Sequence, residues 1–198
     1  MGHMDAAAAD IRYLNTLRVH WKRNKAFPSM AKMADVVGLK SAAGVFALVG
    51  RLSDAGYLQR TDGRIAPTKK FFSYRLLGSV RAGVPQEVDQ YEGFEVLNVE
   101  DYLIAHPERT SFCTVRGDSM TGAGLLDGDI VVVEHNTPTK PGDIVVAVVD
   151  GRATVKSLAL EAGEYVLKPE NPAYEVIRPG ESLEVLGVVV GSFRSMRR

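Results

Sequence analysis

The chain contains only one cysteine among its 198 residues, Cys113, which excludes an intrachain disulfide and favours a reducing compartment. Cys113 lies in the alternating stretch SFCTV, a pattern that predicts a buried structural thiol. The sequence also lacks an apolar run long enough to span a membrane and a charged-then-apolar secretory leader. These absences predict a cytoplasmic protein without a membrane segment, and no metal or cofactor is expected.

The formal net charge is zero, but the two signs are unevenly distributed along the chain. Residues 5–75 contain thirteen lysine and arginine residues against five aspartate and glutamate residues, a net charge of +8. Residues 76–198 contain eleven against nineteen, a net charge of −8. A basic part joined to an acidic part indicates that only the first part binds a polyanion.

Apolar residues recur at helical spacing in three segments of the first third of the chain. Ser29 and Ser41 are suited to N-cap the second and third helices, which Gly38 and Gly56 would end. The residues expected on the apolar faces are Ile11, Leu14, Leu17 and Trp21, then Met30, Met33 and Val37, then Val45, Leu48, Val49, Leu52 and Ala55.

A short hairpin is predicted after the third helix, in the stretch YLQRTDGRIAPT, because Asp62-Gly63 suits a type I′ turn. Three helices and a basic hairpin predict a winged helix-turn-helix over residues 5–75, which places the third helix in the DNA major groove. The wing would then bring basic side chains to the phosphate backbone, namely Arg60, Arg64, Lys69 and Lys70.

The pattern changes to short β-rich runs after about residue 92. Turns separate the runs FEVLNV, SFCTV, DIVVVE, DIVVAVVD, RATVKSLAL, EYVLKP and LEVLGVVVGSF, and only VEDYLIA is helical in pattern. This spacing predicts a mostly antiparallel β domain over residues 93–198. Residues 76–92, rich in glycine and small residues, are expected to form a linker, so the fold class is α+β with two domains.

Ser119 follows Gly-Asp in the turn-rich stretch VRGDSMTGAGLLDGD, where it could stabilise a turn or act as a nucleophile. Lys156 lies in the apolar strand ATVKSLAL, and burial would lower the pKa of its ammonium group. A neutral lysine beside a serine can take its proton, and the backbone N–H groups of Asp118 and Ser119 could bind the oxyanion. The residues alone favour the commoner alternative, a surface lysine whose apolar stem packs against the protein.

Five ordered motifs resemble the C-terminal domain of the LexA-like repressors, a family that includes UmuD-type proteins and self-cleaving phage repressors. They are VRGDSM, LLDGDIVVV, GDIVVA, TVKSL and KPENPAY. The resemblance implies that Ser119 is the nucleophile and Lys156 the general base of an autocatalytic Ser-Lys peptidase. It also implies that Ala82-Gly83 in the linker is the bond cleaved, where small side chains suit close approach of the chain.

The resemblance further implies a bacterial, nucleoid-associated repressor of the SOS response to DNA damage. Its expected partners are double-stranded operator DNA, a second copy through the C-terminal domain, and the RecA filament on single-stranded DNA, which stimulates cleavage. LEVLGVVVGSFRS resembles the strand through which family dimers pair. A phage-type repressor and a UmuD-like polymerase accessory are the alternatives, and the winged helical domain favours a LexA repressor over both.

The expected recognition helix departs from the LexA pattern, because small and apolar residues stand where those repressors present polar side chains. This predicts an operator distinct from that of ordinary LexA repressors, with more phosphate and shape readout. Phe46 could contact a thymine methyl group or pack into the core. The residues expected to contact DNA are Lys40, Ser41, Ala43, Gly44, Phe46, Arg60 and Arg64.

Overall fold

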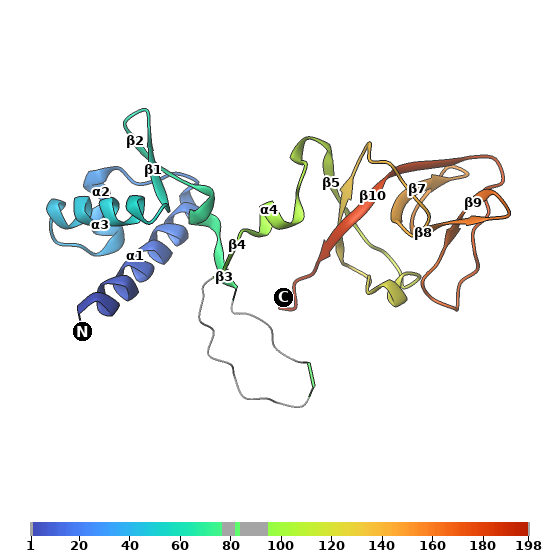
Figure 1. The fold of residues 1–198 in the computed structure, drawn as a ribbon, viewed down its shortest axis with the longest axis horizontal. Coiled ribbons are helices and arrows are strands. Elements are labelled where there is room, and N and C mark those ends of the chain that lie inside the picture. The colour runs from blue at the N-terminus through green and yellow to red at the C-terminus, as the bar shows by residue number, and fades with distance from the viewer. Residues whose placement is uncertain (1, 77–81, 84–94, 198) are drawn as a thin grey trace. The chain divides into compact units, whose positions relative to one another are not determined.

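The computed structural model describes residues 2–76, 82–83 and 95–197, which form two compact units, Met1–Val99 and Glu100–Arg198 (Figure 1). The first contains three long helices and short strands, and the second is mostly antiparallel sheet, which confirms the α+β fold class. Most of the linker predicted for residues 76–92 lies outside the described residues. The units divide at residue 99 rather than at 93, so the predicted domain boundaries stay a prediction.

Helices form in all three predicted segments of the first unit, and the second and third begin and end near the predicted caps and glycines. The three helices are α1 (Gly2–Asn24), α2 (Met30–Val37) and α3 (Ala42–Asp54). The Ser29 side chain accepts a hydrogen bond from the Lys32 backbone N–H at 3.4 Å, and Ser41 accepts one from Gly44 at 3.1 Å. Gly38, with φ of 74°, ends α2 in the left-handed region. These contacts confirm both predicted N-caps.

The predicted hairpin follows α3 and consists of β1 (Leu58–Thr61) and β2 (Arg64–Pro67). Asp62 and Gly63 have φ values of 50° and 74°, as a type I′ turn requires. A 3₁₀ turn, η1 (Lys69–Phe72), leads to β3 (Tyr74–Leu76), which pairs antiparallel with β4 (Glu95–Leu97).

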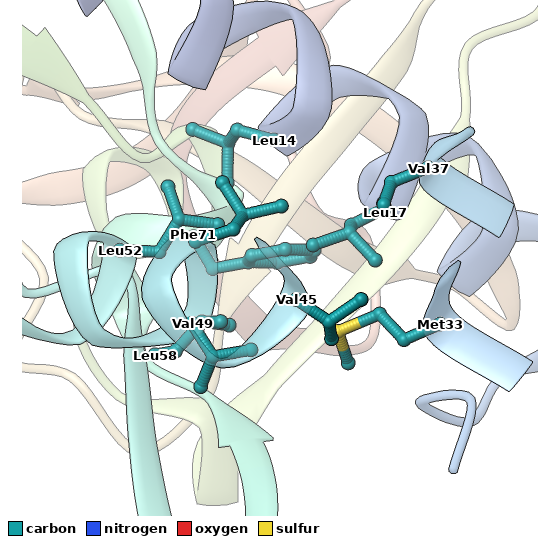
Figure 2. Close-up of a cluster of buried hydrophobic side chains, with 10 residues drawn as sticks. Leu14, Leu17, Met33, Val37, Val45, Val49, Leu52, Leu58 and Phe71 are labelled. Carbon is teal, nitrogen blue, oxygen red and sulfur yellow. The ribbon is translucent and has the colours of Figure 1, made fainter. Parts of the chain in front are cut away.

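Helices and hairpin enclose one hydrophobic core, in which Phe71 is fully buried among leucine and valine side chains (Figure 2). The predicted apolar faces of α1, α2 and α3 supply most of this core. Two predicted residues are exceptions: Ala55 is exposed as the C-cap of α3, and Ile11 is only partly buried and lies outside this core. The buried residues are Leu14, Leu17, Met33, Val37, Val45, Leu48, Val49, Leu52, Leu58 and Phe71.

Within the described ranges, no single helix is both long and apolar enough to span a membrane. Only α2 and α3 taken together meet that test of length and composition, and the pair is bent by 89°.

The second unit contains a six-stranded sheet in the order β5-β6-β10-β7-β8-β9, in which every neighbouring pair is antiparallel. A short helix, α4 (Val99–Leu103), and a 3₁₀ turn, η2 (Pro107–Arg109), precede it, and η3 (Thr121–Ala123) lies between β5 and β6. The strands are β5 (Thr110–Thr114), β6 (Ile130–Glu134), β7 (Ile144–Val149), β8 (Arg152–Glu161), β9 (Glu164–Lys168) and β10 (Leu183–Phe193). Six of the seven predicted β-rich runs contribute a strand to this sheet, whereas FEVLNV forms β4, which pairs with β3 in the first unit.

The long strand β10 connects two parts of this sheet. Its first half, up to Val188, pairs with β7, and its second half pairs with β6. Gly187 lies at the crossing, where an added Cβ would come within 2.7 Å of the Glu134 carbonyl oxygen. Glycine is therefore required for the close approach of β10 and β6.

Candidate active site and DNA-binding surface

The loop that carries Ser119 runs from β5 to β6 and is tied back onto itself. The Val115 N–H donates to the Asp129 carbonyl oxygen at 2.8 Å, and the Gly128 N–H donates to the Val115 carbonyl oxygen at 3.0 Å. Gly117 has φ of 88°, and its N–H donates to the Asp127 carboxylate at 2.8 Å. The glycines and acids of this stretch thus form a defined turn.

Lys156 lies on β8, and its Nζ is 2.8 Å from Ser119 Oγ although the two residues are 37 positions apart. The lysine side chain is buried, with 7% of the residue exposed. Nζ also lies 2.8 Å from the Val155 carbonyl oxygen and 3.1 Å from Thr154 Oγ1. Among the described residues, no carboxylate accompanies these three contacts of the amine.

Burial lowers the pKa of Lys156, because desolvation disfavours the charged ammonium. A neutral amine has two N–H donors and one lone pair. The Val155 carbonyl can only accept, and Thr154 Oγ1 can accept as well, so these two contacts take both N–H groups. The lone pair is then left for the Ser119 hydroxyl, and this arrangement can remove its proton.

A groove of about 350 Å³ opens beside Ser119 and Lys156. Residues of β5, β7, β8 and the serine loop line it, namely Cys113, Thr114, Val115, Arg116, Ser119, Met120, Val146, Ala153, Thr154, Val155 and Lys156. Cys113 is half-buried and packs against the core next to Val131 and Val133, so the prediction of a buried thiol holds only in part. The rest of the wall is mostly apolar, which suits a small, uncharged peptide segment.

The backbone N–H groups of Asp118 and Ser119 donate to no acceptor in the described part of the chain. They are therefore available to an added oxygen, as an oxyanion site requires. The predicted cleavage residues, Ala82 and Gly83, are both exposed. These two belong to the first unit and Ser119 to the second, so the cleavage bond stays a prediction.

Two sets of contacts around the serine loop were not predicted from the sequence. The buried Asp129 carboxylate accepts from Arg194 Nη2 at 2.9 Å and lies 2.7 Å from its Nε. The Asn171 side chain donates to the Asp118 carbonyl oxygen, and the Tyr174 hydroxyl donates to the Asp118 carboxylate. The hydrogen bond to the carboxylate raises the pKa of Tyr174. The resemblance of KPENPAY to a family motif was the only signal that this second segment matters.

The exposed face of the N-terminal half of α3 is apolar. Phe46 is 57% exposed, which excludes the alternative that it packs in the core. Ala43 beside it is exposed, whereas Gly44 is half-buried against the Ser41 hydroxyl that caps the helix. Of the residues expected to read DNA, Gly44 is thus the least accessible, and the Ser41 oxygen already accepts a hydrogen bond within the protein.

Basic side chains flank this face. Lys40 is exposed before α3, and Arg60 and Arg64 are exposed on the hairpin, beside a groove of about 540 Å³. Lys69 and Lys70 are not on the wing, because both lie on η1. Lys70 Nζ donates to the Ala55 carbonyl at 2.8 Å and lies over a tyrosine ring, and its phosphate contact stays a prediction.

Within the described ranges, no group of three or more histidine, cysteine, aspartate or glutamate side chains is arranged to hold a metal ion.

Comparison with known proteins gives matches over both units. The LexA DNA binding domain matches residues 7–65, and the Peptidase S24-like family matches residues 75–190. The LexA repressor of Opitutus terrae is 35% identical over 179 residues, covering 86% of this chain and 88% of the relative. That of Pelotomaculum thermopropionicum is 36% identical over 184 residues, covering 85% and 87%. LexA repressor 1 of Nocardia farcinica is 31% identical over 211 residues, covering 97% and 96%.

Proposed function

This chain belongs to the LexA repressor family, and on that premise we propose how its two units repress transcription and end repression by cutting the chain between them. As a family member it is a transcriptional repressor of the SOS response, with a DNA-binding domain and a self-cleaving peptidase domain. The observation that carries the mechanism is the 2.8 Å contact between the buried Lys156 amine and Ser119 Oγ.

In the proposed reaction Ser119 Oγ attacks the carbonyl carbon of Ala82, and the serine proton passes to Lys156 Nζ. The N–H groups of Asp118 and Ser119 bind the oxyanion. The bond between Ala82 and the Gly83 nitrogen then breaks, and Lys156 returns the proton to that nitrogen. Water hydrolyses the resulting ester with the same amine as base. The substrate is tethered, so an intramolecular encounter replaces a bimolecular one.

Operator binding is assigned to the first unit, with α3 in the major groove and Arg60 and Arg64 on phosphates. The side chains of Ala43 and Phe46 have no polar group. We therefore assign to α3 apolar contacts with thymine methyl groups rather than bidentate hydrogen bonds to base edges. The exposure of Phe46 and the flanking basic residues support this assignment. The operator then differs from that of ordinary LexA repressors.

The second unit supplies the dimer contact. From Val189 onward β10 pairs only with β6 among the described strands, so one backbone edge is left for a strand of the second copy. Phe193 of this half of β10 is exposed, and its ring centroid is 5.8 Å from that of the exposed Phe112 on β5. Cleavage at Ala82-Gly83 separates the DNA-binding unit from the dimer, and the loss of linked half-site binding ends repression. The RecA filament on single-stranded DNA favours the cleavable position of the loop.

The test is a mass spectrum of the purified protein before and after incubation with RecA, single-stranded DNA and nucleotide. The expected result is two fragments that end at Ala82 and begin at Gly83, with no cleavage in Ser119→Ala. The rate constant should be independent of protein concentration. It should rise about tenfold per pH unit below the Lys156 pKa and level off above it. A rate constant proportional to concentration, or a different cut, contradicts the proposal.

A further inference from the structure

The segment KPENPAY, residues 168–174, forms a loop after β9 whose base is closed by backbone hydrogen bonds. The Leu167 N–H donates to the Ile177 carbonyl and the Ile177 N–H to the Leu167 carbonyl, both at 2.9 Å. Asn171 closes the loop further, because its side-chain oxygen accepts from the Ala173 N–H at 3.0 Å. The loop is therefore anchored to the sheet independently of the residues it contacts.

The backbone of this loop is hydrogen-bonded to the serine loop at two points. The Glu170 N–H donates to the Ser119 carbonyl oxygen at 2.9 Å, and the Gly122 N–H donates to the Glu170 carbonyl oxygen at 2.6 Å. A Cβ at Gly122 would overlap that same carbonyl oxygen, so only glycine allows the approach.

Two side chains of the loop hold Asp118, the residue directly before the nucleophile. Asn171 Nδ2 donates to the Asp118 carbonyl oxygen at 3.0 Å. The Tyr174 hydroxyl donates to Oδ1 of the Asp118 carboxylate. The peptide groups on both sides of Ser119 Cα are thus fixed from the same segment, while the N–H groups of Asp118 and Ser119 donate to no acceptor in the described structure.

From these contacts we infer that Asn171 and Tyr174 are positioning residues for the nucleophile. The inference rests on the self-cleavage proposed above. The two side chains hold the serine loop so that Ser119 Oγ faces Lys156 and the adjacent N–H groups face the oxyanion. Glycines lie on both sides of the serine, at Gly117 and Gly122, so the loop needs such external contacts to keep one conformation. Among the described residues, Lys156 Nζ contacts Ser119, Thr154 and Val155 but neither of the two positioning side chains, so its base strength should stay unchanged.

The experiment compares Asn171→Ala, Tyr174→Phe and their double variant with the wild-type full chain. One assay follows self-cleavage against pH. The other follows labelling of Ser119 by a small organophosphorus fluoride, which reacts with the serine oxygen but does not need the linker. Each single variant should lower both rates together by about tenfold, because misplacement by about 1 Å costs up to about 100-fold. The pH midpoint of cleavage should not move, and the thermal unfolding midpoint should shift by less than about 4 °C.

Tyr165→Phe is the matched control, because Tyr165 is an exposed tyrosine of the same domain whose hydroxyl has no hydrogen-bond partner among the described residues. It should behave as wild type. Slower cleavage with unchanged labelling would overturn the inference and assign the loop to linker binding. Unchanged rates, or a shifted pH midpoint, would overturn it as well. Ser119→Ala runs alongside: if it still cleaves, the proposed function fails, whereas if it is inert and the loop variants are fully active, only this inference fails.

Discussion

The two units differ in where their functional groups lie. In the second unit the reacting groups are held inside the protein, since Lys156 is buried and the serine loop is bound on several sides. In the first unit they lie outside, since Phe46 is 57% exposed and has only an apolar ring to offer. A catalytic site is thus specified by contacts within the chain, whereas a DNA-reading surface is specified by a partner that the chain does not contain.

This difference has a physical consequence for substitution. A change inside the active site breaks hydrogen bonds that other residues depend on, so the chemistry tolerates few alternatives. A change on the exposed face of α3 leaves the folded core intact and alters only which bases are favoured. The family matches cover both units, residues 7–65 and 75–190, so the departure of α3 from the family pattern stays a prediction.

The largest effect is expected from removing either member of the dyad. Ser119→Ala and Lys156→Ala should each lower the self-cleavage rate constant by on the order of 10⁴-fold or more, because no other base contacts Ser119 Oγ in the described structure. Operator affinity should be unchanged, as the first unit has its own core. Gel analysis of cleavage and a binding titration measure the two effects, and any cutting in Ser119→Ala would remove the dyad from the mechanism.

Sequence reasoning succeeded where one residue and its neighbours decide the outcome. Ser29 and Ser41 cap their helices, and the Asp62-Gly63 turn follows from positive φ at both residues. The pairing of Ser119 with Lys156 was also predicted, but from the resemblance to a family rather than from the chemistry of neighbouring residues.

Sequence reasoning failed where the outcome depends on a distant partner. Nothing near Tyr174 indicates that it binds Asp118, 56 positions earlier. Likewise, nothing near Lys70 indicates that its amine donates to the Ala55 carbonyl, 15 positions earlier. The sequence left open whether Phe46 is buried or exposed, because it lies at the edge of the buried stripe of its helix. Only the packing of the folded protein decides such a position.

The next largest effect is expected on operator affinity, at the exposed face of α3 in the first unit. Operators selected from random DNA should contain thymines opposite Phe46, and Phe46→Ala should weaken binding by about 1–3 kcal/mol. Replacing those thymines by deoxyuridine removes only a methyl group and should cost about 0.8 kcal/mol each. In Phe46→Ala the same replacement of thymine by deoxyuridine should cause no loss of affinity. A double-mutant cycle measures this coupling between Phe46 and the methyl group. Deoxyuridine placed outside the contacted positions is the control, and equal affinity for both operators would contradict methyl readout.

A smaller effect is expected on the stability of the second unit. The folded-state pKa of Lys156 is lowered, so the unfolded chain binds more protons and the lysine destabilises the fold at neutral pH. This cost is fully present below the folded pKa and is lost as pH rises toward the unfolded value of about 10.4. Lys156→Met should therefore stabilise the unit by about 1.4 kcal/mol per unit of pKa depression.

The measurement is urea unfolding against pH, with both proteins carrying Ser119→Ala so that neither cleaves itself. The gain from Lys156→Met should shrink steadily above neutral pH. A gain that is the same at every pH would mean that packing, rather than desolvation of the charge, limits the stability of this site.

The smallest effect is expected on the salt dependence of DNA binding, at the hairpin of β1 and β2. Arg60→Gln and Arg64→Gln each remove a proposed phosphate contact, so the slope of log affinity against log salt should fall by about 1 for each. Affinity should drop alike for operator and unrelated DNA, because phosphates carry no sequence information. Lys70→Gln is the matched control, since its amine is already bound to the Ala55 carbonyl, and it should leave the slope unchanged. If Lys70→Gln lowers the slope while the arginine variants do not, DNA contacts η1 instead of the hairpin.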